Sequence, residues 1–467
     1  MAALLLSSAL PISRFAFIFK PSSHRGWFPN SRPLFIQFRR SLCPPLNPLQ
    51  SQFKPLCVAS SALKPAAPIM AREDVVILGI ETSCDDTAAA VVRGNGEILS
   101  QVVSSQADLL ARYGGVAPKM AEEAHLLAID KVVQQALDNA NLTAHDLSAV
   151  AVTIGPGLSL CLRVGVCKAR RIAGMHSLPI VGIHHMEAHA LVARLTEKDL
   201  HFPFLALLIS GGHNLLILAR DLGHYVQLGT TIDDAIGEAY DKTARWLGLD
   251  MKKGGGPALE ELARQGDADS IKFSIPMRQH KDCNFSYAGL KTQVRLAIES
   301  RKICIENTPI SSANPDDRSS RADIAASFQR VAVLHLEDRC ERAIEWALKI
   351  EPSIKCLVVS GGVASNQYVR KRLNHVVNNS GLRLVCPPPS LCTDNGVMVA
   401  WTGIEHFLVG RFDPPPLANE PEDYLVDLRP RWPLGEEYSQ GRSEARSLKR
   451  ARIHPSLTSI IQGSMQQ

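Results

Sequence analysis

The sequence predicts an α/β protein made of two lobes of similar plan, with a nucleotide-binding cleft between them. Each half of the chain opens with three successive strand-like segments, at 75–104 and 204–229, and continues into helical patterns. Buried apolar strands also end twice in Ser-Gly-Gly, at 210–212 and 360–362. A glycine turn after a strand exposes backbone N–H groups, which suits phosphate. Two such turns at matching places favour a nucleotide site over two unrelated tight turns.

The N-terminal segment, residues 1–72, has the composition of an organelle transit peptide. It contains nine Lys or Arg and neither Asp nor Glu, and it is rich in Ser and Pro. Acid-free sequence of this kind is typical of transit peptides, and a disordered basic tail is the alternative. Without these nine charges the formal net charge falls from +5 to about −4, so binding of a nucleic acid would require a local basic patch.

The rest of the composition is that of a globular, intracellular protein. Hydrophobic residues make up 45% of the 467 residues and charged residues 21%, which allows two or three domains with a large buried core. None of the eleven cysteines forms a CxxC pair, which argues against a zinc ribbon or a thioredoxin-type site. No apolar run is long enough to span a bilayer, so we expect no stable membrane insertion.

The first lobe is expected over residues 73–183. Its first strand, 75–80, is continuously apolar, as expected of a strand buried on both faces, and it ends in the acidic loop 81–87. Hydrophobic periodicity and turn residues give the other elements. We predict strands at 88–92, 97–104, 149–154 and 179–182, and helices at 122–140 and from the Gly-Pro-Gly turn at 155–157 to residue 173.

The second lobe is expected over residues 184–410. Within it, residues 305–321 are rich in Ser, Asn, Pro and charge without clear periodicity, and they are predicted to form an exposed loop. Residues 411–467 are predicted to form an irregular basic tail. We predict strands at 204–209, 215–219, 225–229, 356–359 and 383–386, and helices at 233–247, at 285–300 after an initial turn, at 322–350, after residue 366 and at 396–407.

A pair of histidines at the start of the second lobe predicts a metal site. His185 and His189 are four residues apart, so a helix places them on one face, and imidazole is a common ligand of transition metals. The alternative is that one ring packs or caps and the other is exposed, and the neighbouring His184 is expected to pack. Asp394 is a candidate helix N-cap, and its carboxylate is also placed to complete a His₂Asp site for Zn²⁺ or Fe²⁺.

Several polar residues of the second lobe are candidates for contacts with a nucleotide. Asp241 lies two turns into a predicted helix, where a cap does not explain it, and its carboxylate suits ribose hydroxyls. Asp233 and Asp234 fit plain helix caps instead. The glycine-rich loop 254–257 permits close backbone approach, although it also fits an ordinary turn, and Asn366 also fits a helix cap. No residue stands out as a covalent nucleophile.

Together these motifs resemble those of the TsaD family of tRNA N6-adenosine threonylcarbamoyltransferases, formerly called O-sialoglycoprotein endopeptidases. The resemblance extends over about residues 75–410. The extra Lys252-Lys253-Gly254 before the Gly-Gly-Pro turn departs from the pattern, and no motif covers the insertion 305–321 or the tail. The matching segments, in chain order, are Gly79-Ile80-Glu81-Thr82-Ser83-Cys84-Asp85-Asp86, Gly155-Pro156-Gly157-Leu158, His185-Met186-Glu187-Ala188-His189, Ser210-Gly211-Gly212-His213, Asp233-Asp234-Ala235, Asp241-Lys242, Ser360-Gly361-Gly362-Val363 with Asn366, and Cys392-Thr393-Asp394-Asn395-Gly396.

The resemblance implies the two-lobed actin/Hsp70/sugar-kinase fold, in which duplicated RNase H-like lobes enclose a nucleotide cleft. It implies an acyltransferase that moves the threonylcarbamoyl group of threonylcarbamoyl-AMP to N6 of adenosine 37 in tRNAs that read codons beginning with A. A separate synthase would supply this adenylate. The leader and the family together imply the mitochondrion, with a plastid or both organelles as alternatives, and a homodimer.

The resemblance also implies roles for individual residues. One divalent ion, Fe²⁺ or Zn²⁺, would be held by His185, His189 and Asp394. The partner is tRNA, and the basic segment 442–452 is a candidate contact with it. The residues implied to bind the adenylate are Leu208, Ile209, Ser210, Gly211, Gly212, Asp241, Gly256 and Asn366.

Three other functions compete with this interpretation. A metallopeptidase of the HExxH type needs its general-base Glu directly after the first His, but Met186 occupies that place, and Glu187 is about 200° round the helix from His185 and would face away from the metal. An ATP-driven kinase or chaperone of the same fold normally holds Mg²⁺ through carboxylates and phosphates, so the histidine pair argues against it. A non-enzymatic scaffold would tolerate loss of His185.

Overall fold

The computed structural model of the protein describes residues 71–106, 117–251, 254–301, 303, 309–419 and 427–441, all within one compact unit. The predicted transit peptide lies outside the described residues except for its last two positions. Within the described part of the chain, no helix combines the length and apolar character needed to cross a membrane. Short 3₁₀ helices occur at η1 (Arg72–Asp74), η2 (Ala144–Asp146), η3 (Ile310–Ser312) and η4 (Gly362–Ser365).

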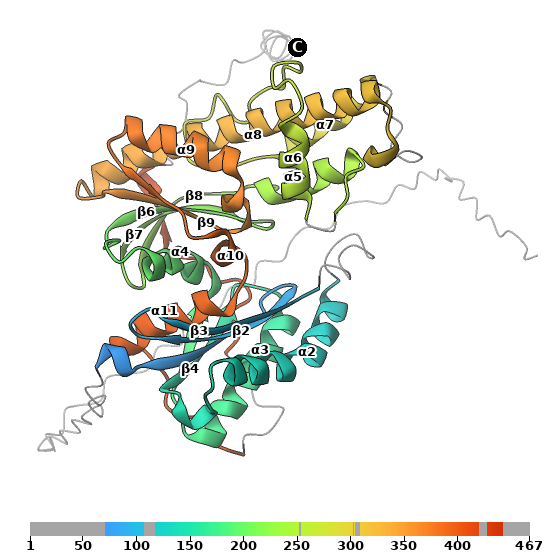
Figure 1. Ribbon diagram of the computed structural model, residues 1–467. Coiled ribbons are helices and arrows are strands. Elements are labelled where there is room, and N and C mark those ends of the chain that lie inside the picture. Colours follow the sequence, from blue (N-terminus) through green and yellow to red (C-terminus); the bar gives the residue numbers. More distant parts are fainter. Residues whose placement is uncertain are drawn as a thin grey trace, which may run out of the picture. The chain divides into compact units, whose positions relative to one another are not determined.

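The first sheet has five strands in the order β3-β2-β1-β4-β5. β1 is antiparallel to β2 and parallel to β4. Leu78 packs with α2 and α3 on one face, whereas Ile77 packs on the opposite face, which α11 covers (Figure 1). Burial on both faces explains why β1 is apolar from Val76 to Ile80. The elements are β1 (Val76–Glu81), β2 (Asp86–Arg93), β3 (Ile98–Ser105), α2 (Pro118–Asn139), β4 (Ala149–Gly155), α3 (Ser159–His176) and β5 (Ile180–His184).

The second sheet repeats this plan. Its order is β10-β9-β6-β7-β8-β11, so β6 to β10 follow the order of β1 to β5, with β11 added at one edge. The central strand β6 is again antiparallel to the following strand, β7, and parallel to the third strand after it, β9. The predicted duplication of the lobes is therefore confirmed. The strands are β6 (Phe204–Ile209), β7 (Asn214–Asp221), β8 (His224–Thr230), β9 (Cys356–Ser360), β10 (Arg383–Val385) and β11 (Glu436–Glu437).

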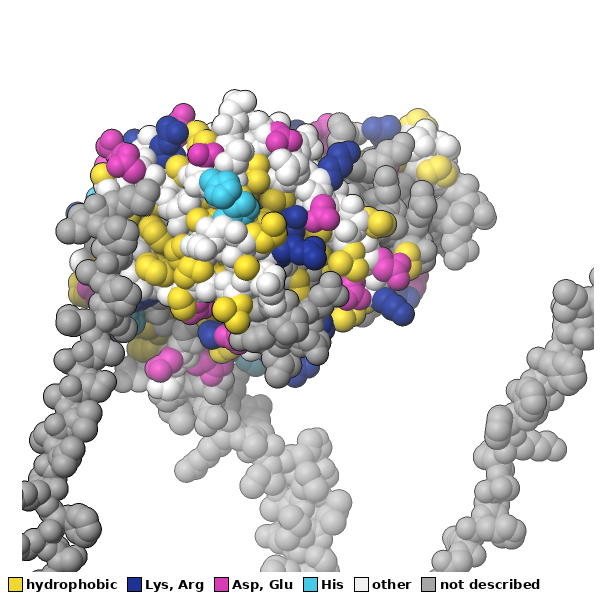
Figure 2. Space-filling model, turned by 90° about the horizontal axis from the view of Figure 1, so that it is seen from below, with side chains coloured by type: hydrophobic (Ala, Val, Ile, Leu, Met, Phe, Trp, Pro, Cys, Tyr) yellow, Lys and Arg dark blue, Asp and Glu magenta, His cyan; other side chains and the backbone are white. Residues whose placement is uncertain are grey.

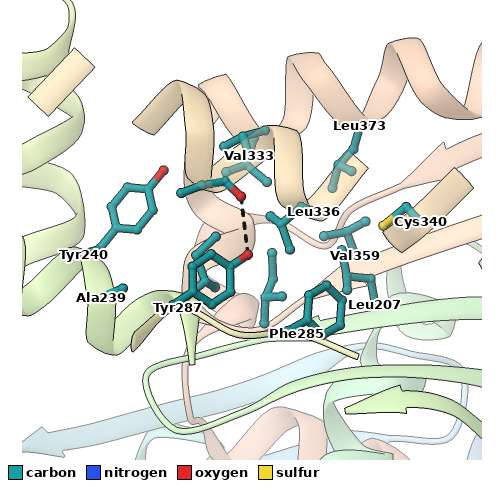
Figure 3. Close-up of a cluster of buried hydrophobic side chains, with 14 of the residues drawn as sticks. Leu207, Ala239, Tyr240, Phe285, Tyr287, Val333, Leu336, Cys340, Val359 and Leu373 are labelled. Carbon is teal, nitrogen blue, oxygen red and sulfur yellow. Dashed lines mark hydrogen bonds between the residues drawn. The ribbon is translucent and has the colours of Figure 1, made fainter. Parts of the chain in front are cut away.

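Helices cover one face of the second sheet and enclose a large apolar core. This core contains Leu207 from the sheet, Phe285 from the segment before α7, and Leu336 from the long helix α8 (Figure 3). The buried hydroxyl of Tyr287 donates a hydrogen bond to the carbonyl oxygen of Ala332 at 3.3 Å, so the polar end of this aromatic ring is satisfied inside the core. The helices are α5 (Ile236–Trp246), α6 (Gly255–Ala263), α7 (Ala288–Ser300), α8 (Pro315–Ile350) and α9 (Gln367–Asn379).

The predicted exposed loop 305–321 is wrong over its second half, because α8 already begins at Pro315. The side chain of Asn314 caps the helix by accepting from the backbone N–H of Asp317 at 2.8 Å, and proline is favoured in the first turn. Arg321 is fully buried, and its guanidinium donates to Asp317 and, at 3.0 Å, to the carbonyl oxygen of Leu247. Asp317 and Arg321, whose charges made this segment resemble a loop, therefore pair with each other within α8. Residues 305–308 lie outside the described part of the chain.

Two helices connect the lobes, so the predicted boundary of the second lobe is also wrong. α4 (His185–Thr196) and α11 (Gly396–Leu408) share one apolar cluster with both sheets. After the short helix α10 (Pro389–Cys392), the chain returns to the first sheet, where α11 packs on β1, β2 and β4 (Figure 1). Arg194 of α4 and Glu405 of α11 form an ion pair at 2.8 Å. The predicted range 184–410 therefore assigned α11 to the wrong sheet.

Part of the predicted irregular tail is held against both lobes. We call residues 427–441 the strap. Its Arg429 N–H donates to the carbonyl oxygen of Ile154 in β4 at 2.8 Å, and its Tyr438 N–H donates to the carbonyl oxygen of Gln227 in β8 at 2.9 Å. β11 lies between these two anchors and pairs with β8. Residues 442–467, including the basic segment, lie outside the described residues.

Close packing of α11 on the first sheet yields a prediction. Any Cβ added to Gly79 would collide with the backbone of Gly396 and Ala400, and backbone atoms cannot turn aside. We expect Gly79→Ala to lower the free energy of unfolding by about 2–3 kcal/mol, measured by urea denaturation. Gly289→Ala is the control, because a Cβ there meets no atom within 4 Å; it should be neutral or stabilising by up to about 1 kcal/mol. Equal effects of the two changes would contradict the packing argument.

Candidate functional site

The start of α4 is fixed by a histidine that is not a candidate ligand. His184 Nδ1 accepts hydrogen bonds from the backbone N–H groups of Met186 at 3.1 Å and Glu187 at 3.4 Å. Its Nε2 lies 3.0 Å from the carbonyl oxygen of Trp432 in the strap. Burial lowers the pKa of His184 to about 4, which keeps the ring neutral and able to accept. His184, predicted to pack, therefore also serves as the N-cap that orients the following histidines.

The structure brings the three predicted metal ligands together. His185 and His189 lie one turn apart on α4, and both rings are buried. Asp394 Oδ1 lies 3.0 Å from His189 Nε2 and 3.7 Å from His185 Nε2. One ligand atom of each residue lies within 4.8 Å of the others. Two imidazole nitrogens and one carboxylate oxygen are a donor set that fits Zn²⁺ or Fe²⁺.

Asp394 is free for this role because its neighbour caps the helix. The side-chain oxygen of Asn395 accepts from the backbone N–H of Met398 at 2.8 Å, and its amide donates to the carbonyl oxygen of Thr393 at 2.7 Å. Asn395, and not the predicted Asp394, is therefore the N-cap of α11. The Asp394 carboxylate faces the two histidines instead.

The charges of this cluster depend on one another. Burial would raise the pKa of Asp394, but the charge of His185 and the hydrogen bond from His189 hold it well below its ordinary value. Burial would likewise lower the pKa of His185, yet Asp394 and Glu81 raise it to about 9. Burial and repulsion from the two histidines lower the pKa of the nearby His213. The site thus favours positive charge between its carboxylates.

Glu187 faces away from the ligands, as predicted. Its carboxylate accepts from the hydroxyl of Tyr225 at 2.6 Å and lies 3.0 Å from Nε2 of His406 on α11. Both carboxylate oxygens are engaged in these contacts, and the hydrogen bonds and the charge of His406 offset burial and lower the pKa of Glu187. A general base for metal-dependent peptide cleavage must reach the metal-bound water, so this arrangement disfavours the metallopeptidase.

The first Ser-Gly-Gly turn lies beside the start of α5 and the second turn. A Cβ on Gly237, in the first turn of α5, would collide with Ser210 and Gly211. A Cβ on Gly361, whose φ is +97°, would collide with the backbone of Ile209. By contrast, Gly212 is exposed. The turns are therefore packed against protein on one side and open on the other, which suits a phosphate.

The remaining residues predicted to bind the adenylate differ in how many hydrogen bonds they already make within the protein. One carboxylate oxygen of Asp241 accepts from the Gly255 N–H at 3.1 Å, and burial raises the pKa of Asp241. A Cβ on Gly256 would meet no atom within 4 Å, so the backbone is open there. Asn366 caps α9 by accepting from Val369 N–H at 3.0 Å and donates to Gln329 at 3.1 Å. The alternative role of Asn366 as a cap is thus present in the structure.

Leu208 and Ile209 are fully buried strand residues of β6. Only their backbone is therefore suited to face a ligand at the end of the strand. His213, directly after the Ser-Gly-Gly turn, interacts electrostatically with all three candidate ligands. The open glycine turn and the His₂Asp cluster thus belong to one site.

An acidic loop after β1 adjoins this cluster. His125 on α2 holds the loop, because its ring nitrogens lie 2.8 Å from Thr87 Oγ1 and 3.2 Å from the carbonyl oxygen of Cys84. Burial and the charge of Asp394 raise the pKa of Asp85. Burial and the charge of Asp85 raise the pKa of Asp86 to about 6. The loop therefore concentrates negative charge beside the candidate metal ligands.

Comparison with known proteins identifies the family. The family model described as TsaD, tRNA N6-adenosine threonylcarbamoyltransferase, matches residues 97–401. A probable mitochondrial tRNA N6-adenosine threonylcarbamoyltransferase of Arabidopsis thaliana is 77% identical over 85% of this chain and 82% of its own length. The chain belongs to the TsaD family.

Other members of the TsaD family are similar over most of their length. The tRNA N6-adenosine threonylcarbamoyltransferase of Rhizobium etli (strain CIAT 652) is 46% identical over 77% of this chain and 94% of its own. The mitochondrial enzyme of Xenopus tropicalis is 45% identical over 72% of this chain and 83% of its own. The protein is accordingly an acyltransferase that acts on tRNA, as the sequence predicted, and its two sheets have the two-lobed α/β plan that was expected.

The raised pKa of Asp86 predicts a pH dependence of stability. Its pKa is about 6 in the folded protein, against 3.8 ordinarily, so the folded state favours the protonated carboxyl. This contribution is present below about pH 3.8 and is lost as the pH rises through about 6. In metal-free protein, Asp86→Asn should therefore raise the free energy of unfolding relative to wild type more at about pH 7.5 than at about pH 4.5. Urea denaturation at both pH values measures this, and a pH-independent difference would contradict it.

Proposed function

We propose that the protein transfers the threonylcarbamoyl group of threonylcarbamoyl-AMP to N6 of adenosine 37 in tRNAs that read codons beginning with A. The observation that carries the proposal is the convergence of His185, His189 and Asp394 beside an open glycine turn. In the reaction, N6 forms a bond to the carbamoyl carbon, and the bond from that carbon to the phosphate oxygen breaks. AMP leaves with the electron pair, and the amine loses a proton.

The three ligands are proposed to hold one divalent ion, Fe²⁺ or Zn²⁺. When bound, the ion supplies a Lewis acid that polarises and holds the oxygens of the threonylcarbamoyl group. The protein holds His185 and His189 on a buried, capped helix, so the two rings keep their separation without rearrangement. Asp394 contributes a negative charge that the two rings already stabilise. These residues therefore orient the carbonyl group for attack.

The adenylate is proposed to lie along the glycine turns. Within the segment 208–212, the N–H groups of Gly211 and Gly212 would take the phosphate, because the Ser210 N–H already donates to the carbonyl oxygen of His213 at 2.8 Å. Gly256 would allow close backbone approach, and the Asp241 carboxylate, which accepts from Gly255, would take a ribose hydroxyl. Asn366, at the start of α9, would be a further contact with the adenylate. Rate enhancement then comes from orientation and from electrostatic stabilisation of the carbonyl oxygen, without a covalent nucleophile.

The cellular setting follows from the same proposal. The relatives from Arabidopsis thaliana and Xenopus tropicalis are named mitochondrial, and the acid-free leader supports the same organelle for this chain. A threonylcarbamoyl-AMP synthase would supply the adenylate. We also propose a homodimer, for which exposed Leu126 and Leu127 on α2 are suitable contact residues.

The contact with tRNA is proposed to be local. On the face seen in Figure 2, basic and acidic side chains are interspersed with apolar ones, so the described residues of this face form no continuous basic surface. A duplex-like RNA stem attracts clustered Lys and Arg. The basic segment 442–452 therefore remains our proposed contact.

Loss of any candidate ligand should abolish transfer while preserving the fold. We expect His185→Ala, His189→Ala and Asp394→Ala each to lower kcat/KM by about 1000-fold or more, because the Lewis acid contributes several kcal/mol to transition-state stabilisation. Reconstitution with purified protein, tRNA and threonylcarbamoyl-AMP, followed by mass spectrometry of the modified adenosine, measures this. His201→Ala, at an exposed histidine, is the control and should retain activity. Normal transfer by all three ligand variants would refute the metal assignment.

The ribose contact predicts a defect in binding. Asp241→Ala should raise the KM for threonylcarbamoyl-AMP about tenfold, the equivalent of one hydrogen bond of about 1.4 kcal/mol, with a smaller change in kcat. Initial rates at varied adenylate concentration separate the two constants. Glu261→Ala on the adjacent helix α6 removes a carboxylate that is exposed and serves as the control. An unchanged KM in Asp241→Ala would show that the carboxylate does not contact the adenylate.

A further inference from the structure

Glu81 is an unusual residue for its position, because it ends a strand that is otherwise apolar. Its side chain is fully buried, and a buried carboxylate is costly unless hydrogen bonds or charges compensate it. The acidic loop begins directly after it, but Glu81 itself points into the protein. Its compensation comes from β4, from the loop and from α4.

Three groups surround this carboxylate. The backbone N–H of Ser83 donates to Oε1 at 2.5 Å. The hydroxyl of Thr153, on β4, donates to Oε2 at 2.5 Å. Nδ1 of His185 lies 3.2 Å from the same Oε2 and 3.2 Å from Ser83 Oγ. Each oxygen of Glu81 thus faces hydrogen-bond donors from fixed elements.

We propose that Glu81 is a positioning residue that keeps the imidazole proton of His185 on Nδ1 and thereby presents the Nε2 lone pair to a metal ion. The inference rests on the proposed metal role of His185. A neutral imidazole carries one proton, so the nitrogen that faces a carboxylate is the donor and the other nitrogen is the ligand. Carboxylate partners of this kind orient metal-bound histidines and increase their affinity for the ion.

The other ligand ring lacks such support. Nδ1 of His189 is buried and has no hydrogen-bond partner among the described residues. The carboxylate of Glu187, also buried and on α4, bonds Tyr225 and His406 instead. Of these two buried carboxylates, only Glu81 touches a ligand ring, so Glu187 provides a matched comparison.

The surroundings make Glu81→Gln an informative change. Ser83 N–H requires an oxygen at the Oε1 position, so the amide nitrogen of Gln would occupy the Oε2 position. That nitrogen is a donor only, and it would face Nδ1 of His185. The ring would then accept at Nδ1 and carry its proton on Nε2, where the metal must bind. The hydroxyl of Thr153 can rotate and accept one N–H of this amide nitrogen, so it does not prevent this exchange.

The test measures metal binding and the imidazole proton separately from activity. Titration of metal-free protein with Co²⁺, followed by its visible absorption, should show about 10–100-fold weaker binding for Glu81→Gln, and Glu187→Gln should bind as wild type does. In ¹⁵N-histidine-labelled protein, NMR should place the His185 proton on Nδ1 in the zinc-loaded wild type. In metal-free Glu81→Gln it should place the proton on Nε2.

Two results would overturn the inference. One is wild-type Co²⁺ affinity in a folded Glu81→Gln protein. The other, which needs no variant, is a zinc-loaded wild type in which His185 binds through Nδ1 or carries no proton there. A separate comparison tests the metal role of His185 itself. If wild type and His185→Ala bound Co²⁺ equally, His185 would not be a ligand, and both this inference and the proposed function would lose their basis. If only Glu81→Gln bound as wild type does, the inference alone would fail.

Discussion

The packing of α4 against α11 is the constraint on which the site depends. Two of the three candidate ligands come from the first turns of α4, and the third lies directly before α11. The ion pair between Arg194 and Glu405 fixes the two helices against each other. Glycines at positions 79 and 396 allow α11 to approach the first sheet closely. The distance from Asp394 to the histidines is therefore set by packing that lies away from the site.

The electrostatics of the site follow from this geometry. Two carboxylates face the histidines, and two more lie in the adjoining acidic loop. Asp394 faces both rings, Glu81 faces one, and Asp85 and Asp86 belong to the adjoining loop. In a region of low dielectric such a surplus of negative charge favours a bound cation. The same charge would repel phosphates, so the neutral backbone donors of the glycine turns are the better place for the nucleotide.

Much of the fold was predictable from the sequence because a strand buried on both faces is continuously apolar, which is easy to recognise. The strands around residues 78 and 207 are apolar without alternation, and their repeated order produced the correct two-lobed plan. The return of α11 to the first sheet was not predictable, because an apolar helix does not indicate which sheet it covers. The start of α8 was missed although Asn314 and Pro315 form a standard N-terminal signal; the charged residues after them concealed it, and Arg321 proved to be buried.

The sequence indicated which residues form the site better than it indicated how those residues contact one another. The spacing of His185 and His189 indicated a shared face, and Asp394 was a candidate third ligand that the family resemblance also implied. The role of His184 as a cap depends on its ring orientation, which no spacing reveals. Glu81 lay within a recognised motif, but its contact with His185 joins residues 104 positions apart. Only the folded chain brings these two residues together.

The strap has a mechanical consequence for the two lobes. It bonds β4 at one end and β8 at the other, and Trp432 between these anchors contacts the histidine that caps α4. A rotation that separated the sheets would lengthen the path between the anchors and break one of these bonds first. The strap therefore limits how far the two sheets can rotate away from each other.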